Sequence, residues 1–226
     1  MRAEGRGKIP DAAAALQPLW RGSGSPRTSP LADRQIAIEA IVEDLEAKLA
    51  LFGRLDEIIL GRDAVLASNT SSFPIITLAA ATGRPERVVG LHFFNPVPVL
   101  SLVEVAPSLL TSTQTADRAT ISVEETLHKH AILCQDRAGF VVNALLVPFI
   151  LSVIRMLEAG VATAEDIDVS MVRGASHPIG PLALADLIGL ETIRAVANSL
   201  YDEYRDQAVG VAAGAGPAIL RRRRSA

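Results

Sequence analysis

The sequence has few cysteine and aromatic residues. Its 226 residues include one cysteine, Cys134, and 4% aromatic side chains. A single thiol cannot form a disulfide within the chain, and the surrounding residues offer no second ligand at the spacing of a zinc site. We therefore expect a protein that is compatible with a reducing compartment and holds no metal.

Long apolar runs are also missing. No run reaches the ~18 residues that a membrane-spanning helix needs, although 49% of the residues are hydrophobic. The first residues, "MRAEGRGKIPDAAAALQ", lack the continuous apolar stretch of a secretory signal. These absences predict a soluble, cytoplasmic protein without a membrane partner.

Positive charge is scarce in the body of the chain. The net charge is −3, and acidic residues outnumber basic ones by 22 to 12 within residues 35–206. Such a body is a poor surface for nucleic acid. The run "RRRR" at 221–224 is either an anion-binding patch or a solvated tail, and we favour the tail because no aromatic residues alternate with it.

Hydrophobic patterning begins near residue 35. Residues 1–34 mix Gly, Pro, Ser and Arg without periodicity, which predicts a flexible segment. Residues 35–136 then alternate short apolar runs with amphipathic stretches, as in "QIAIEAIV" followed by "EDLEAKLALFGRLDEII". Strand and helix patterns in alternation predict an α/β domain with a parallel, Rossmann-like sheet and crossover helices.

The pattern turns wholly helical beyond Asp136. Residues 137–206 predict an all-α domain, and its first helix, over 140–157, is apolar on nearly every face. A helix of that kind is buried in its own domain or shared with a second subunit, so we expect a homodimer. Residues 207–226 lack periodicity and predict a disordered tail.

Polar residues cluster where the predicted strands end. Ser71 follows the strand "AVLAS", His92 ends the strand "RVVGLHF", and Asn95 and Glu104 lie just beyond. An open parallel sheet binds its ligands at the carboxyl ends of its strands. These residues are therefore candidates for one site.

His92 and Glu104 are each unusual in their surroundings. A lone histidine is commonly a satisfied core imidazole, but His92 stands beside Phe93 and Phe94, which would exclude water. A glutamate between Val103 and Val105 is costly to bury unless it is paired. Pairing with the imidazole resolves both features, and a carboxylate that orients a histidine is typical of a general base.

Six motifs resemble one enzyme family in order and spacing. "ASNTSS", "GLHFFNPVPV", "LVEV", "GFVVNALLVP", "EDID" and "HPIGPLALADLIGL" are similar to segments of the 3-hydroxyacyl-CoA dehydrogenases, including the 3-hydroxybutyryl-CoA enzymes, over about residues 32–206. The resemblance implies NAD-linked oxidation of an (S)-3-hydroxyacyl-CoA to the 3-ketoacyl-CoA in fatty acid metabolism and β-oxidation. It also implies an acyl-CoA substrate and a helical domain that pairs two subunits.

The resemblance assigns roles to individual residues. His92 matches the histidine that takes the hydroxyl proton, and Glu104 matches the acid that orients it. Ser71 and Asn143 match groups that hold the substrate oxygens and thioester.

A second set of matches concerns the cofactor. Glu43, Lys48 and Ser71 match NAD contacts, and Asn95 matches a residue beside the nicotinamide.

The sequence departs from the family at its glycine-rich phosphate-binding motif. No G-x-G-x-x-G turn follows a strand, since "GSGSPR" lacks the third glycine and "GAGPAI" lies near the carboxyl end. We therefore expect a truncated NAD-binding domain with weak NAD affinity and little activity. The alternative is a non-catalytic remnant that acts only in dimerisation or acyl-CoA binding.

Overall fold

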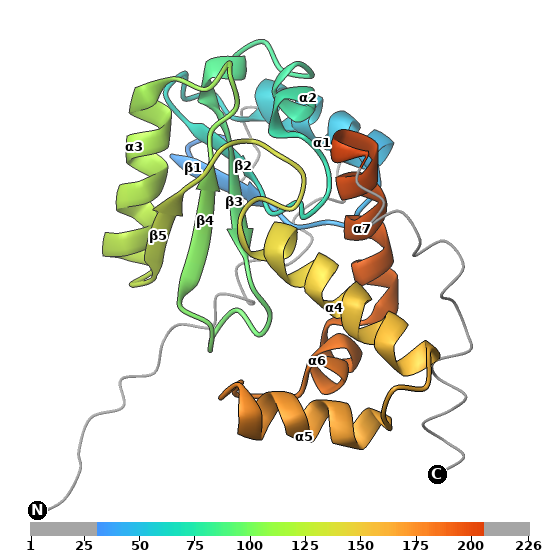
Figure 1. The fold of residues 1–226 in the computed structure, drawn as a ribbon. Helices are drawn as coiled ribbons and strands as arrows, with labels where there is room; N and C mark the ends of the chain where they lie inside the picture. Colours follow the sequence, from blue (N-terminus) through green and yellow to red (C-terminus); the bar gives the residue numbers. More distant parts are fainter. Residues whose placement is uncertain (1–30, 206–226) are drawn as a thin grey trace, which may run out of the picture. The chain divides into compact units, whose positions relative to one another are not determined.

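The computed structural model describes residues 31–205, which form two compact units (Figure 1). Within this range the first unit holds residues 31–70 and 75–133, and the second holds residues 71–74 and 134–205. Most of the expected segment 1–34 and all of the tail 207–226 lie outside the described residues. None of the helices in the described range is long and apolar enough to span a bilayer.

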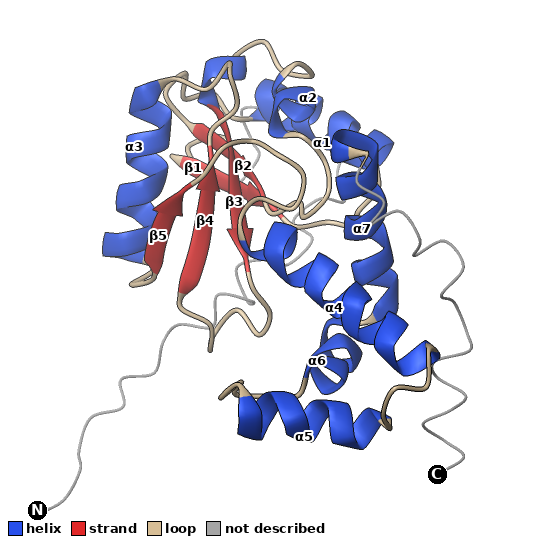
Figure 2. Ribbon diagram, in the orientation of Figure 1, coloured by secondary structure: helices blue, strands red, loops and turns tan. Residues whose placement is uncertain are grey.

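The first unit is built on a five-stranded sheet with the strand order β1-β2-β3-β4-β5 (Figure 2). The strands are β1 (Ile36–Glu39), β2 (Val65–Ser68), β3 (Val88–Phe93), β4 (Leu102–Ala106) and β5 (His130–Leu133). Strands β1, β2 and β3 are parallel, as are β4 and β5, but β4 runs antiparallel to β3. The α/β class is confirmed, and one connection differs from the expected crossover pattern. Only residues 94–101 join β3 to β4, and so short a link makes a hairpin because a parallel crossover needs a dozen or more residues.

Helices cover both faces of this sheet. They are α1 (Leu45–Ile58), α2 (Ile75–Ala79) and α3 (Thr113–Ile121). Val89 and Leu91 of β3 pack with Ala119 of α3. A Cβ on Gly90, between them, would lie 2.9 Å from Ile75 Cδ1, so its absence lets α2 approach the strand. Burying each large apolar side chain in these layers stabilises the fold by about 1.5–3 kcal/mol.

The ends of β1 and α3 show where the apolar run and the helix stop. Strand β1 ends at Glu39, and residues 40–42 are exposed rather than part of a buried strand. Helix α3 ends at Ile121 and passes into a π turn (Ser122–Thr126). The chain then reverses at His128, which has a φ of 53°, and enters β5.

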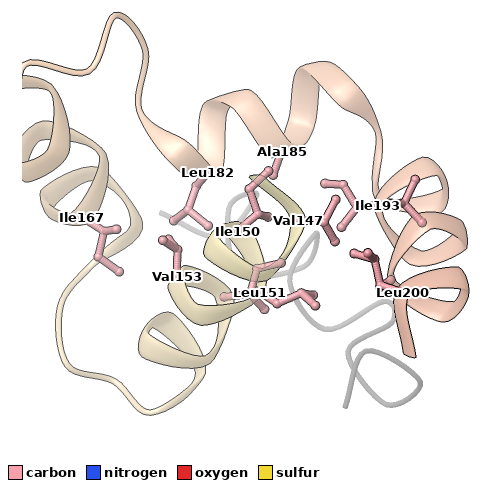
Figure 3. Packing of buried hydrophobic residues seen from close by; sticks show 12 residues of the cluster. Val147, Ile150, Leu151, Val153, Ile167, Leu182, Ala185, Ile193 and Leu200 are labelled. Atoms are coloured by element: carbon pink, nitrogen blue, oxygen red, sulfur yellow. The ribbon is translucent and has the colours of Figure 1, made fainter. Parts of the chain in front are cut away.

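The second unit is helical, as predicted. It contains α4 (Val142–Glu158), α5 (Ala164–Gly174), α6 (Pro181–Ile188) and α7 (Leu190–Tyr204). The Thr163 hydroxyl accepts a hydrogen bond from Asp166 N and caps α5, and Gly189 separates α6 from α7 with a φ of 91°. The four helices share one apolar core (Figure 3), whose buried residues are Val147, Ile150, Leu151, Val153, Ile154, Ile167, Leu182, Ala185, Ile193, Val196, Ala197 and Leu200.

Helix α4 is not buried on every face within the single chain. Val147, Ile150 and Ile154 are buried in the core, but Leu145 is 72% exposed and Met156 46% exposed. The sequence pattern alone did not distinguish these apolar positions from the buried ones.

Candidate active site

His92 and Glu104 lie opposite each other on neighbouring strands. They are register partners in the β3–β4 hairpin, and His92 Nδ1 lies 2.7 Å from Glu104 Oε2. His92 is 3% exposed and Glu104 is fully buried. A carboxylate at Nδ1 fixes the orientation and the tautomer of an imidazole ring.

Aromatic and polar neighbours hold the His92 ring and its strand. The Phe94 ring meets the His92 ring in an edge-to-face arrangement with a centroid distance of 4.6 Å. The Asn69 Oδ1 accepts a hydrogen bond of 2.8 Å from Phe93 N. Asn69 therefore ties the segment after β2 to the end of β3, a role that was not expected from the sequence.

Glu43 and Lys48 meet beside the turn between β1 and α1. Lys48 Nζ lies 3.1 Å from Glu43 Oε2, 2.6 Å from Glu39 Oε1 and 3.5 Å from Ile41 O. The Lys48 side chain is 1% exposed, whereas that of Glu43 is 33% exposed. Of Glu43 and Lys48, only Glu43 has a side chain that reaches the surface of its unit.

Three further members of this cluster were not predicted from the sequence. Glu39 is buried at the end of β1, and its Oε2 accepts a hydrogen bond of 2.6 Å from Ser68 Oγ at the end of β2. Thr70 Oγ1 donates to Glu43 Oε1 at 2.6 Å. The signal was available, because a glutamate within the apolar run "IAIEAIV" needs a partner as much as Glu104 does.

Asn95 follows β3 in the loop that leads to β4. It is exposed, and its peptide bond to Pro96 is cis. Lys129 Nζ donates to Val97 O at 2.6 Å and to Leu100 O at 2.7 Å, which fastens this loop to the segment before β5.

The remaining two candidates, Ser71 and Asn143, belong to the second unit. Ser71 opens the segment 71–74, where Ser72 O accepts a hydrogen bond of 2.6 Å from Ser199 Oγ of α7. Asn143 is the second residue of α4 and is partly buried. The structure therefore brings together His92 with Glu104 and Glu43 with Lys48. In residues 31–205 no three His, Cys, Asp or Glu side chains are grouped to hold a metal ion.

These features define a class of protein. An open α/β sheet that carries polar groups at the ends of its parallel strands is the architecture of dinucleotide-binding enzymes. A buried histidine and carboxylate in contact is the arrangement of a general base and its orienting acid.

The family follows from comparison with known proteins. Residues 2–137 match the 3-hydroxyacyl-CoA dehydrogenase NAD binding domain, and residues 139–221 match the C-terminal domain of the same family. The chain belongs to the 3-hydroxyacyl-CoA dehydrogenase family. NAD is the cofactor for which the matched N-terminal domain is named.

Individual relatives agree with the family match. The chain is 53% identical over 180 residues to a 3-hydroxybutyryl-CoA dehydrogenase of Mycobacterium tuberculosis, an alignment covering 80% of this chain and 63% of the relative. The crystal structure of M. tuberculosis FadB2 superposes with a TM-score of 0.79 at 52% identity, over 85% of this chain and 66% of that one. The (S)-3-hydroxybutyryl-CoA dehydrogenase PaaH1 of Ralstonia eutropha gives a TM-score of 0.74 at 43% identity, over 84% and 64%. The chain thus spans about three fifths of the length of the curated relative.

Proposed function

We propose that this protein is an NAD-dependent 3-hydroxyacyl-CoA dehydrogenase of the 3-hydroxybutyryl-CoA type. Its reaction would be the oxidation of an (S)-3-hydroxyacyl-CoA to the 3-ketoacyl-CoA. The observation that carries this proposal is the buried contact of 2.7 Å between His92 Nδ1 and Glu104 Oε2. Relatives whose names state this activity support it.

The proposed chemistry begins at His92. Its Nε2 takes the proton of the substrate hydroxyl, while Glu104 accepts a hydrogen bond from Nδ1–H and stabilises the imidazolium that forms. Burial strengthens this pairing because few water molecules screen it. When bound, NAD supplies the acceptor for the hydride that leaves C3 of the substrate.

The cofactor would lie along the ends of the parallel strands. The Glu43 carboxylate, on a side chain that is one-third exposed, can accept hydrogen bonds from hydroxyl groups of a dinucleotide while Lys48 contacts it from the interior, so this part of the structure fits NAD. Asn95 and Ser71 would contact the nicotinamide half. No G-x-G-x-x-G turn occurs in the sequence to hold the pyrophosphate.

The substrate and assembly assignments belong to the same proposal. Ser71 and Asn143 would hold the oxygens and thioester of an acyl-CoA, residues 35–136 would form the cofactor domain, and residues 137–206 the substrate and dimerisation domain. The exposed Leu145 and Met156 of α4 support a homodimer through that domain. We place the enzyme in the cytoplasm, in fatty acid metabolism and β-oxidation.

One observation favours a second candidate. Because the sequence has no glycine-rich phosphate turn, the chain would serve only in dimerisation or acyl-CoA binding if it does not bind NAD. Calorimetric titration of the 226-residue protein with NAD separates the two candidates, since the non-catalytic one binds none.

The test of the proposed function compares histidine variants. With (S)-3-hydroxybutyryl-CoA and NAD as substrates, His92→Ala should abolish most of the NADH formed, and Glu104→Gln should lower kcat by at least tenfold, about 1.4 kcal/mol of barrier. His130→Ala, at an exposed position of β5, is the matched control and should retain the wild-type rate. Equal rates for His92→Ala and His130→Ala would exclude His92 as the base.

A further inference from the structure

Glu39 is a highly connected buried charge of the first unit. Its Oε1 accepts hydrogen bonds from Ile41 N at 2.8 Å and from Lys48 Nζ at 2.6 Å, and its Oε2 accepts one from Ser68 Oγ at 2.6 Å. The three donors come from the turn after β1, from α1 and from the end of β2. One carboxylate thus joins the three segments that surround Glu43.

The ammonium of Lys48 is used inside this cluster. Its three N–H groups have acceptors on Glu39, Glu43 and the Ile41 carbonyl, and the side chain is 1% exposed. A buried ammonium is strongly unfavourable unless it is paired, and Glu39 is its fully buried partner. Glu39 therefore holds Lys48 in place.

Glu43 is the one member of this charged group with substantial exposure. One of its oxygens lies 3.1 Å from Lys48 Nζ and the other accepts from Thr70 Oγ1 at 2.6 Å, while a third of its side chain faces solvent. Lys48 and Thr70 contact the Glu43 carboxylate from the interior, and its solvent-facing side can bind a ligand.

We propose that Glu39 is a positioning residue for cofactor binding. Glu39 fixes the position of the Lys48 ammonium, and Lys48 in turn fixes the position of the Glu43 carboxylate. This inference rests on the proposed function, in which Glu43 meets the hydroxyl groups of the dinucleotide. Glu39 itself touches no ligand. Lys48 then acts through Glu43 rather than as a cation exposed to the cofactor phosphates.

The substitution Glu39→Gln tests the charge without changing the shape. Its amide oxygen can still accept from Ile41 N, but the neutral side chain no longer balances the Lys48 ammonium. Glu57→Gln, at an exposed position of α1, is the matched control. By calorimetry, Glu39→Gln should raise the Kd for NAD at least tenfold and leave the Kd for acetoacetyl-CoA within twofold, whereas Glu57→Gln should change neither. A general folding defect would instead raise the Kd for NAD and the Kd for acetoacetyl-CoA alike.

Lysine labelling gives a second measure that needs no ligand. The sequence has lysine only at positions 8, 48 and 129, so reductive methylation followed by mass spectrometry resolves each one. Lys48 should be protected in the wild type and in Glu57→Gln but labelled in Glu39→Gln, at unchanged helix content by circular dichroism. If the wild type fails to bind NAD, the proposed function is wrong, while the labelling still decides whether Glu39 positions Lys48. Continued protection of Lys48 in a folded Glu39→Gln protein would overturn the inference.

A shorter acid covers the case in which Glu39→Gln does not fold. Glu39→Asp keeps the negative charge but moves it back by one methylene group. Lys48 should therefore become accessible to methylation in this variant, and the Kd for NAD should rise by a smaller factor than in Glu39→Gln. Wild-type values for both measurements in Glu39→Asp would also refute the proposal.

Discussion

Replacing Gly180 by alanine should destabilise the helical unit through a residue on another helix. Gly180 is the N-cap of α6, with a φ of −64° that any residue can adopt, so its role is not conformational. A Cβ at this position would lie 2.3 Å from Asp168 Cγ and 2.4 Å from Asp168 Cβ. Asp168, on α5, accepts hydrogen bonds from Leu182 N at 2.7 Å and Ala183 N at 3.1 Å and thereby caps α6.

The size of the effect follows from what the new methyl group displaces. Moving Asp168 costs the charge-assisted cap, worth about 0.5–2 kcal/mol, and forcing the two helices apart costs about 1–3 kcal/mol more. We expect Gly180→Ala to lower the free energy of unfolding by about 2–4 kcal/mol. Gly174→Ala is the control: a methyl group on Gly174, at the end of α5, would meet no atom within 4 Å. Replacing this helical glycine by alanine should raise the free energy of unfolding by up to about 1 kcal/mol.

Urea unfolding followed by circular dichroism in the far ultraviolet measures both variants. The midpoint should fall for Gly180→Ala and stay level or rise for Gly174→Ala. Asp168→Ala, which removes the cap without adding a methyl group, should reproduce part of the Gly180→Ala loss. The reasoning is refuted if Gly180→Ala and Gly174→Ala have the same midpoint.

Two further predictions concern a surface arginine and the assembly. Arg84 donates to the carbonyls of Asp56, Ile59 and Gly61 at 2.6–2.7 Å around the carboxyl end of α1. In urea unfolding, Arg84→Ala should lower the free energy of unfolding by roughly 1–3 kcal/mol, and Arg84→Lys should show most of that loss because an ammonium cannot reach all three carbonyls. Full stability of Arg84→Lys would contradict this. Sedimentation at micromolar concentration should show a dimer that Leu145→Asp converts to monomer, and a stable wild-type monomer would disprove the proposed assembly.

The pairing of His92 with Glu104 was predictable, but the antiparallel strand pairing that produces it was not. His92 and Glu104 stood out because each is out of place in an apolar strand. Hydrophobic patterning carried little information on strand direction here, since β3 is buried on both faces although it pairs with a parallel strand on one side and an antiparallel strand on the other. The better signal was the short connection over 94–101, whose length favours a hairpin and sets His92 directly across from Glu104.

The contact between Glu39 and Lys48 was not predicted, because hydrophobic patterning looks for apolar residues on the inner face of a helix. The buried positions of α1 are Lys48, Phe52, Leu55 and Ile58, so one of the four is charged. Hydrophobic patterning alone would place a lysine on the exposed face of the helix. Glu39 explains the buried lysine, because a carboxylate at the end of a buried strand can balance the charge of an ammonium nine residues later. Two buried charges of opposite sign therefore predict each other, although each alone contradicts the hydrophobic pattern. Just as Glu104 could be predicted from His92, Lys48 could have been predicted from Glu39.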